Sequence, residues 1–526
     1  MECQLGLSFR VDNTGTGRSM SSKSQLNLYS SFRRNFPALE TVLLTTNAGT
    51  FYTYEDAEHC SAQIANYLIE MGLKRGDRVS AQVPKSPQAL WLYLAVVRAG
   101  MVFHPLNTAY TDEELHFFLQ DAAPAMLVCD SNRSEALQAL CQSVGTPYLY
   151  TLDADGGGTL VQGAQQCSVR FDTAATNAAD LAALVYSSGT TGRPKGIMLS
   201  HGNLVENISV LVDYWGFGED DCLLHALPIF HVHGLFVAIG CVLMSGGSLR
   251  WLHEFDVKTV MQNLPYSTVM MGVPTYYTRL LVERDFNVQH CVRTRLFVSG
   301  SAPLLADTFV EFEQRTGHRI LERYGMTETG MNTSNPLRGE RRAGTVGFPL
   351  PGVEVRICGA DNNILEGKGV GGLQVRGSNV FSGYWNMPKK TAEDFTSDGF
   401  FITGDQACMD EEGYISIVGR SKDMVISGGL NVYPKEIELL IDELSGVKES
   451  AVIGLPDTDF GEVVVAVVVL VNDATLSGEQ VRGALKARVA NFKVPKRVFF
   501  VDELPRNAMG KVQKETMRKE YGSKAT

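Results

Sequence analysis

The stretch Tyr186–Gly196, with the sequence YSSGTTGRPKG, decides how the rest of this chain is interpreted. It follows the apolar run Leu181–Val185, which indicates a buried strand. Glycine lets backbone N–H groups approach a ligand closely, and Ser and Thr hydroxyls add short donors. Successive N–H groups in such a turn bind anions, and Lys195 adds a positive charge. The stretch therefore predicts a site for a nucleotide polyphosphate, with a plain strand-to-helix loop as the alternative.

This glycine-rich stretch is not a Walker loop. The pattern G-x-x-x-x-G-K-[ST] requires Ser or Thr after the lysine, whereas Gly196 follows Lys195. The reaction in which the polyphosphate takes part has to be inferred from other parts of the chain.

Length and charge limit the possible functions. At roughly 100–200 residues per domain, the 526 residues predict two to four structural units. The formal net charge of −11 argues against a nucleic acid or an anionic membrane as the main partner. Small-molecule substrates are expected instead, and an anionic one would need local Lys and Arg.

The cysteines and the first residues of the chain give indications of the cellular compartment. The ten cysteines form no C-x-x-C pair and show no zinc-ligand spacing, which is typical of reduced thiols in an intracellular protein. The longest apolar runs, Leu235–Met244 and Val463–Val471, are shorter than the ~18 residues of a membrane span. Residues 1–34 are Ser-rich and basic, which resembles a mitochondrial presequence. A disordered leader over 1–27, with translation starting near Met20, is the alternative, and a cytoplasmic protein is expected.

The order of apolar and polar segments predicts an α/β fold. Strand-like and helical segments alternate from Leu28 to Val298, which favours parallel βαβ units with helices on both faces. Short strands and Gly-rich turns over about 337–419 predict a smaller β unit, which completes a core over 28–419. The polar run Gly419–Asp423 is a plausible linker, with a hinge over 420–424 and a compact α+β unit over 425–526.

Four further stretches accompany the opening loop: Ser299–Pro303 (SGSAP), Tyr324–Thr329 (YGMTET), Thr403–Asp405 (TGD), which follows a strand-like segment, and Pro505–Lys511 (PRNAMGK). Each is weak alone. Together, in this order and spacing, they closely resemble the acyl-adenylate-forming (ANL) superfamily of acyl-CoA synthetases, peptide-synthetase adenylation domains and luciferases. The resemblance covers nearly the whole chain.

The resemblance implies a large N-terminal α/β domain with a β-barrel-like subdomain, a small mobile C-terminal domain, and the use of ATP, Mg²⁺ and CoA. Glu328 would hold Mg²⁺, because a hard cation prefers carboxylate oxygen. Tyr324 would stack on adenine, and Asp405 and Arg420 would bind the ribose hydroxyls. The full set of expected ATP contacts is Ser187, Ser188, Gly189, Thr190, Thr191, Gly192, Lys195, Gly300, Ser301, Ala302, Tyr324, Gly325, Met326, Thr327, Glu328, Asp405 and Arg420.

Lys511 matches the catalytic lysine of the superfamily. Attack of a carboxylate on the α-phosphate crowds negative charge at phosphorus, and a cation placed there stabilises the transition state. In the superfamily the C-terminal domain rotates between the two half-reactions, and Lys422 occupies the hinge position. Ser427, Gly428 and Gly429 match the loop that lines the tunnel for the pantetheine arm of CoA, where missing side chains leave room.

The acid is indicated by Leu227–Leu235, Arg323–Pro336 and Ala343–Gly347, which closely resemble malonyl-CoA synthetases. A dicarboxylate keeps one carboxylate ionised inside a closed pocket, so it needs a fixed cation, and Arg offers a planar bidentate fork. Arg295, which opens the strand leading to the adenine loop, is the first candidate. Arg341 or Arg342 is the second, and the family resemblance favours Arg342.

The roles of some residues and several alternative functions stay open at this point. The alternative for both arginines is pairing with nearby acids such as Glu340. His231 matches a family position between the acid pocket and the thiol tunnel, and Ser299 completes the expected malonate set. The alternative functions are a CoA ligase for methylmalonate, acetate or an aryl acid, a stand-alone carrier-loading adenylation enzyme, and a nucleotide-sensing binding module.

Overall fold

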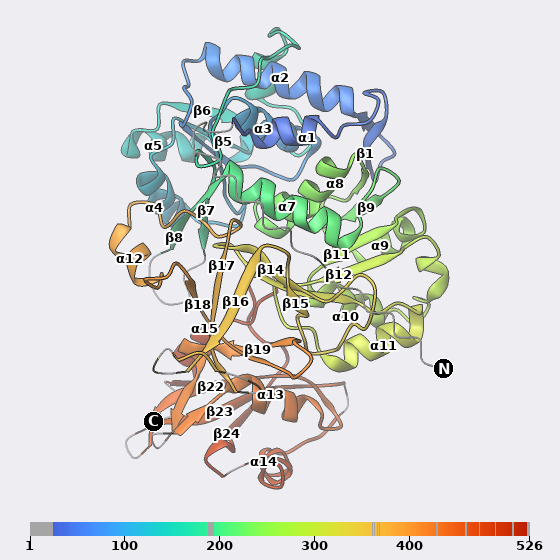
Figure 1. Cartoon of the computed structure of the whole chain (residues 1–526), viewed down its shortest axis with the longest axis vertical. Coiled ribbons are helices and arrows are strands. Elements are labelled where there is room, and N and C mark those ends of the chain that lie inside the picture. Colours follow the sequence, from blue (N-terminus) through green and yellow to red (C-terminus); the bar gives the residue numbers. More distant parts are fainter. Residues whose placement is uncertain are drawn as a thin grey trace, which may run out of the picture.

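The structure is a computed structural model that describes residues 25–187, 194–359, 361, 363–365, 367, 369–427, 430–457, 460–472, 474–489, 491–507 and 510–522 (Figure 1). The chain forms two mainly parallel sheets, a smaller antiparallel sheet and a C-terminal lobe. Among the described residues, no helix is both long enough and apolar enough to cross a membrane.

The first sheet has the strand order β6-β5-β3-β4-β7-β8. Its neighbouring strands are parallel, except that β8 returns antiparallel to β7. The strands are β3 (Arg78–Gln82), β4 (Val102–Pro105), β5 (Met126–Cys129), β6 (Tyr148–Thr151), β7 (Leu181–Ser187) and β8 (Lys195–Ser200). α2 (Tyr54–Glu70) precedes β3, and the segments that connect the strands are α3 (Pro87–Arg98), α4 (Asp112–Ala122), the 3-10 turn η1 (Ser131–Arg133), α5 (Ser134–Val144) and α6 (Thr159–Ala164).

The second sheet has the order β15-β14-β13-β12-β11-β9-β10-β1-β2, and its run from β13 to β1 is parallel. Its strands are β1 (Val42–Thr46), β2 (Phe51–Thr53), β9 (Cys222–His225), β10 (Ser248–Trp251), β11 (Val269–Gly272), β12 (Leu296–Ser299), β13 (Leu321–Met326), β14 (Gly330–Ser334) and β15 (Phe348–Pro349). The helical segments are α1 (Leu28–Arg33), α7 (His201–Trp215), the π-helix η2 (His233–Ile239), α8 (Gly240–Ser245), α9 (Val257–Asn263), η3 (Leu264–Tyr266), α10 (Pro274–Val282), η4 (Val288–Cys291) and α11 (Ala306–Thr316).

A single apolar core joins the two sheets, with α3 inside it. Ser86 caps α3 by accepting a hydrogen bond from Ala89 N, and Pro87 stands at the first helical position, where its missing N–H costs nothing. Nearly every residue of α3 is buried. A helix that is apolar on all sides is stable only when other layers cover it, which explains its place in the core.

The segment predicted as a β unit forms an antiparallel sheet of β16 (Val353–Cys358), β17 (Gly371–Gly377), β18 (Phe401–Met409) and β19 (Ile415–Arg420), with α12 (Pro388–Glu393) between β17 and β18. Asp405 was expected just after a strand, but it lies within β18, because β18 continues through Gly404 with a shifted pairing register. The 3-10 turn η5 (Ser421–Asp423) follows β19.

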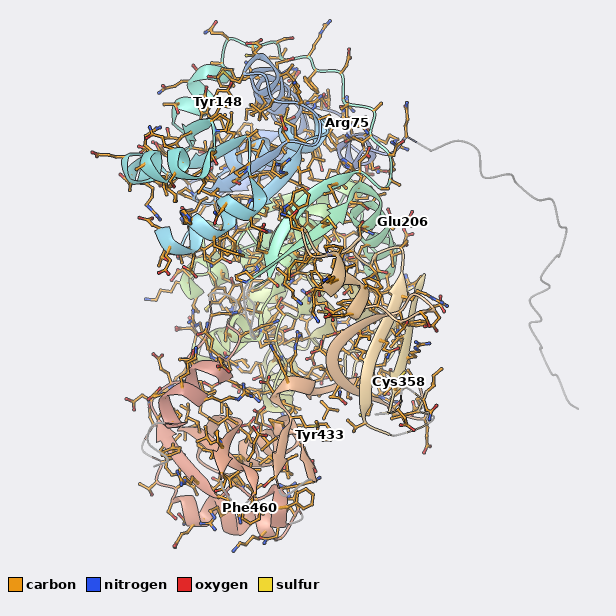
Figure 2. The ribbon with its side chains drawn as sticks, turned by 90° about the vertical axis from the view of Figure 1, so that its left-hand side faces the viewer. Arg75, Tyr148, Glu206, Cys358, Tyr433 and Phe460 are labelled. Atoms are coloured by element: carbon orange, nitrogen blue, oxygen red, sulfur yellow. The ribbon has the colours of Figure 1, made fainter. Side chains whose placement is uncertain are left out.

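The C-terminal lobe is built on β20 (Val425–Ser427), β21 (Leu430–Val432), β22 (Val447–Asp457), β23 (Gly461–Leu470) and β24 (Arg497–Val501). Its helical segments are α13 (Pro434–Asp442), α14 (Gly478–Lys486), η6 (Asn491–Lys493) and α15 (Lys514–Gly522). Alternate residues of β22 and β23 belong to two separate apolar clusters. Figure 2 shows Tyr433 and Phe460 in this lobe and Cys358 on the antiparallel sheet. The predicted boundaries at 419 and 425 stay predictions.

Candidate active site

The candidate site lies where the parallel strands β12 and β13 lead into loops and a hairpin. Ser299 ends β12 and pairs in register with Glu322 of β13. Arg323 and Tyr324 therefore lie beside the turn that begins at Gly300, and ligands of parallel sheets bind at such carboxyl ends. Ser301 in this turn adopts a left-handed conformation with φ of 71°, which is uncommon outside glycine.

Arg323 is a buried cation at this edge. Only 3% of its surface is exposed, and its guanidinium packs against Gly300. Its Nε and Nη2 atoms have no hydrogen-bond partner within the part of the chain that the structure describes. Burial lowers the pKa of Arg323 to about 10. A buried charge without a partner is costly, so this guanidinium is suited to binding an anion.

Further polar side chains come from the end of β12 and the start of η2. The Oγ atom of Ser299 and the Nε2 atom of His233 are buried, and neither has a partner among the described residues. His233 Nδ1 and Ser301 Oγ are hydrogen-bonded at 3.3 Å. Burial and the positive charge of Arg323 hold the pKa of His233 well below its ordinary value, so the ring is neutral. Burial, followed by the charge of Lys511, lowers the pKa of His231 to about 4.

The residues predicted to bind adenosine are brought together. The hydroxyl of Tyr324 donates to Asp405 Oδ2, and Arg420 Nε lies 2.7 Å from Asp405 Oδ1. Asp405 is 3% exposed, and each of its oxygens thus has a partner. The pair Asp405–Arg420 joins two neighbouring strands, because the two residues are in register between β18 and β19. Their individual contacts to ribose and adenine stay predictions.

Glu328 lies in the hairpin between β13 and β14 and is 6% exposed. Burial raises the pKa of its carboxyl group, and the positive charges of Lys195, Arg420 and Lys511 act in the opposite direction. Mg²⁺ typically takes one or two carboxylates together with substrate phosphates and water. A single buried carboxylate among three cations that can receive phosphate fits this arrangement. Within the described ranges, no group of three or more His, Cys, Asp or Glu residues forms a cage for a metal ion.

Lys511 reaches this site from the C-terminal lobe. A methyl group on Gly510 would lie 3.2 Å from Thr275 Oγ1 in α10, so the lysine loop touches the N-terminal part. The side chain of Lys511 is accessible to solvent but has protein on most sides. Desolvation and the charge of Arg420 lower the pKa of Lys511, whereas Asp405 and Glu328 act in the opposite direction. The structure therefore brings Lys511, Glu328 and Asp405 to one place.

Other predicted residues are placed as follows. Lys195 donates to the Tyr384 hydroxyl at 3.1 Å. Ser427 is buried at the end of β20, and Lys422 is exposed in η5. The predicted phosphate-loop residues Ser188, Gly189, Thr190, Thr191 and Gly192, and the tunnel residues Gly428 and Gly429, lie outside the described residues. Ser187, Ala302, Gly325, Met326 and Thr327 lie on or beside β7, β12 and β13, and their ATP contacts stay predictions.

The structure pairs Arg295, predicted to bind malonate, with an acid. Arg295 Nε and Nη2 donate to the two carboxylate oxygens of Asp221 at 2.8 and 2.6 Å. The guanidinium also donates to the carbonyls of Trp215 and Gly216. Arg295 precedes β12, whereas the candidate site lies at the other end of that strand, about 13 Å away along the chain. It therefore joins the amino ends of β9 and β12.

The structure also pairs Arg342 with acids. Its guanidinium forms ion pairs with Glu340, Asp410 and Glu412 and lies 4.0 Å from the ring centroid of Tyr414. The hydrogen bonds that Arg342 donates to Glu340 and Glu412 raise the pKa of Arg342. Three acids already satisfy this cation, so it has no edge left for a substrate carboxylate. Both arginines thus pair with acids, and the roles in malonate binding predicted for them stay predictions.

Sequence reasoning missed Arg323 and His233. Both lie inside motifs that the sequence marks, RYGMTET and PIFHVHG, but neither was given a role. The signal that could have identified Arg323 is its position in a buried segment, formed by Ile320 and the first residues of β13. Charged residues are almost never fully buried unless they are paired.

Comparison with known proteins agrees with this geometry. Residues 32–385 match the AMP-binding enzyme family, and residues 436–511 match the AMP-binding enzyme C-terminal domain. A malonate–CoA ligase of Arabidopsis thaliana is 35% identical over 480 residues, which cover 85% of this chain and 78% of that protein. A feruloyl-CoA synthase of Amycolatopsis sp. is 34% identical over 481 residues, 90% of this chain and 95% of that protein.

Among solved structures, ATP-bound MatB from Rhodopseudomonas palustris is 50% identical and superposes with a TM-score of 0.94, over 95% of this chain and 100% of that chain. The apo structure of the same protein gives a TM-score of 0.82. The predicted fold of parallel α/β sheets with a C-terminal domain is confirmed. The chain belongs to the AMP-binding enzyme family, as an AMP-forming acyl-CoA synthetase that uses ATP, Mg²⁺ and CoA.

Proposed function

We propose that the acid is malonate and that the protein is a malonyl-CoA synthetase. Malonate and ATP would give malonyl-AMP and pyrophosphate, and attack by the CoA thiol would then give malonyl-CoA and AMP. The observation that carries this proposal is the free Nε–Nη2 edge of Arg323. This edge of a guanidinium presents two parallel N–H donors, which match the two oxygens of a carboxylate.

The second carboxylate of malonate has to stay ionised while the first reacts. An ionised group in a closed pocket needs a cation and hydrogen bonds to offset its lost hydration. Arg323 supplies the cation, and the unpaired Ser299 Oγ and neutral His233 lie at the same edge of the sheet. The corresponding edges of Arg295 and Arg342 are occupied by Asp221 and by Glu340.

The same residues suggest how adenylation proceeds. The reacting carboxylate would attack the α-phosphate, with Lys511 stabilising the negative charge that develops on phosphorus. Mg²⁺, held by Glu328, would neutralise charge on the phosphates, and the glycine-rich stretch would hold the departing pyrophosphate. Lys511 then has to leave with the C-terminal lobe so that the thiol can reach the acyl carbon. His231, neutral at pH 7, would stand between acid pocket and thiol tunnel without adding a charge.

Ligases for other acids are the alternatives. Acetate, and aryl acids that carry no second charged group, would leave the Arg323 guanidinium buried without an anionic partner. The free Nε–Nη2 edge therefore disfavours them. Methylmalonate carries the same second carboxylate, and a carrier protein could replace CoA as the thiol. A cytoplasmic location is part of the proposal, with mitochondrial import as its alternative.

The proposal is tested by measuring CoA-dependent AMP release with acetate, malonate, methylmalonate, succinate and benzoate. Malonate should give the highest kcat/KM, and pyrophosphate should appear with AMP. A preference for acetate or benzoate over malonate would overturn the substrate assignment but leave the reaction class in place.

A further inference from the structure

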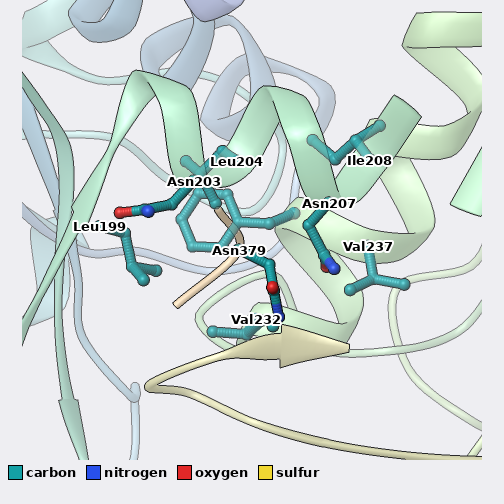
Figure 3. A pocket seen from close by; sticks show the side chains of 10 residues that line it. Leu199, Asn203, Leu204, Asn207, Ile208, Val232, Val237 and Asn379 are labelled. Carbon is teal, nitrogen blue, oxygen red and sulfur yellow. The ribbon is translucent and has the colours of Figure 1, made fainter. Parts of the chain in front are cut away.

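Three asparagines connect the helix that follows the glycine-rich stretch with the hairpin that carries Glu328. α7 begins directly after β8, whose first residue is Lys195. Asn203 and Asn207 of α7 are four residues apart and therefore lie on one face of the helix. Figure 3 shows both, together with Asn379, at a small cavity that they line with apolar neighbours.

Asn207 binds the backbone of the hairpin at two points. Its Nδ2 donates to Met331 O at 2.9 Å, and its Oδ1 accepts from Met331 N at 3.0 Å. Asn207 is 6% exposed, and a methyl group on Gly330 would lie 2.5 Å from its Oδ1 atom. Gly330 has φ of 58°, so only glycine fits both the backbone conformation and the close approach of Asn207.

Asn379 binds the same hairpin. Its Nδ2 donates to Thr329 O at 2.7 Å, and the neighbouring Phe381 N donates to Glu328 O at 2.8 Å. The loop that carries Asn379 is itself held by α7, because Asn203 Nδ2 donates to the carbonyls of Ser378 and Val380, each at 2.8 Å. The hairpin and this loop are thus both fixed to one helix.

These contacts set the backbone on both sides of the Glu328 carboxylate. The carbonyls of Glu328 and Thr329 lie between β13 and β14, so no strand supplies their hydrogen bonds, and buried carbonyls need partners. Met331 of this hairpin also packs in the apolar core, so the asparagine amides fix the backbone beside Glu328 in addition to apolar contact. We propose that Asn207 and Asn379 are positioning residues that fix Glu328 relative to the phosphate-binding stretch. This inference rests on the proposed role of Glu328 in holding Mg²⁺.

The consequence is a specific effect on Mg²⁺. Residues that orient a metal ligand typically contribute about 10–100-fold to metal affinity or activity. Asn207→Ala and Asn379→Ala should each raise the Mg²⁺ concentration for half-maximal adenylation about tenfold or more. The KM for malonate should stay unchanged, because malonate binding does not use the Glu328 carboxylate. The rate of thioester formation from supplied malonyl-AMP should stay unchanged for the same reason.

The experiment measures malonate-dependent ATP–pyrophosphate exchange over a Mg²⁺ titration, with Tm recorded for each variant. Asn66→Ala is the matched control, because Asn66 also holds a loop by two amide-to-carbonyl bonds, to Ser168 and Arg170, far from the site. If an alanine variant does not fold, the serine variant at the same position, which keeps a donor, replaces it.

An unchanged Mg²⁺ requirement in both folded variants would overturn the inference, as would an equal loss in both half-reactions. Glu328→Gln distinguishes the metal-binding role of Glu328 from the positioning role of the asparagines. If it raises the Mg²⁺ requirement and the asparagine variants do not, the positioning role alone is wrong. If it has no effect, the metal role of Glu328 is wrong and the inference falls with it, whereas malonate selectivity stands on Arg323 independently.

Discussion

Arg323 lies so close to Gly300 that a methyl group on Gly300 would stand 2.4 Å from the Arg323 Cζ atom. The absence of a side chain at Gly300 is therefore what allows a guanidinium to lie beneath the loop that follows β12. The cation is held there by packing, while its Nε and Nη2 atoms stay free of partners among the described residues. A rigid, unpaired donor pair is what selective binding of a second carboxylate requires.

Arg295→Ala should affect stability and leave acid selectivity unchanged. Burial on its own raises the pKa of Asp221, but hydrogen bonds from Arg295 and Thr268 outweigh it and lower that pKa. A variant lacking Arg295 leaves Asp221 buried without its cation, and hydrogen bonds to charged groups contribute about 1.5–3 kcal/mol each. Thermal unfolding should show a Tm lower by several degrees at pH 7. Because the Asp221 pKa is depressed, the difference from the native protein should shrink as pH falls through it. A changed malonate-to-acetate ratio would contradict this account.

Lys511→Ala should abolish adenylation and spare thioester formation from supplied acyl-adenylate. Lys511 acts as a cation, and its pKa in the free enzyme lies below the ordinary value of 10.5. The kcat/KM for adenylation should therefore decline on the alkaline side before pH 10.5, and Lys511→Arg should move that decline to higher pH. Pyrophosphate exchange across pH measures the first half-reaction. Equal losses in both half-reactions would remove Lys511 from the proposed role.

Five histidines should make the protein sensitive to mild acid. Burial lowers the pKa to about 3 for His104, to about 4 for His201 and His231, and well below 6.5 for His225 and His233. Each takes up a proton on unfolding below its unfolded pKa of about 6.5. Stability is therefore complete above that pH and declines as pH falls below it, by up to about 1.4 kcal/mol per pH unit for each histidine. Denaturant unfolding at pH 7.5, 6 and 5 measures this, and a constant midpoint would contradict it.

Lys422→Pro should slow the second half-reaction far more than the first. Lys422 lies in η5, between β19 of the antiparallel sheet and β20 of the C-terminal lobe, and proline would fix its φ angle. The neighbouring Asp423 binds Arg518 of α15 at 2.7 Å, so rotation here carries the lobe with it. Single-turnover rates for each half-reaction test this, with Lys422→Ala as the control for loss of the side chain. Equal slowing of both steps would refute a hinge at Lys422.

Much of this structure follows from local sequence. Glycine-rich turns after apolar strands identify the parallel α/β units and the candidate nucleotide site. Tyr324, Asp405 and Arg420 are far apart in sequence, and only their motifs marked them as neighbours; the structure joins all three. Tyr324 lies in β13 of a mainly parallel sheet, whereas Asp405 and Arg420 lie in β18 and β19 of the antiparallel sheet, so the contact among them is a tertiary one.

The choice among arginines could not be made from sequence. Arg295 and Arg323 each stand near an apolar stretch that leads to a loop of the site. The local sequence therefore does not distinguish the two arginines. The difference arises from tertiary contacts. Asp221, 74 residues from Arg295, neutralises that arginine, whereas no described acid hydrogen-bonds to Arg323. A distant partner of this kind leaves no local pattern.

The central claim is that Arg323 binds the second carboxylate of malonate, and Arg323→Met tests it most directly. Losing two hydrogen bonds of about 1.5–3 kcal/mol each should lower kcat/KM for malonate by at least ~100-fold. Activity with acetate should change little, because methionine fills the space without leaving a buried charge. Arg295→Met serves as the matched control. CoA-dependent AMP release with the two acids gives the result: a selective loss for malonate is predicted, and an equal loss for malonate and acetate would contradict the claim.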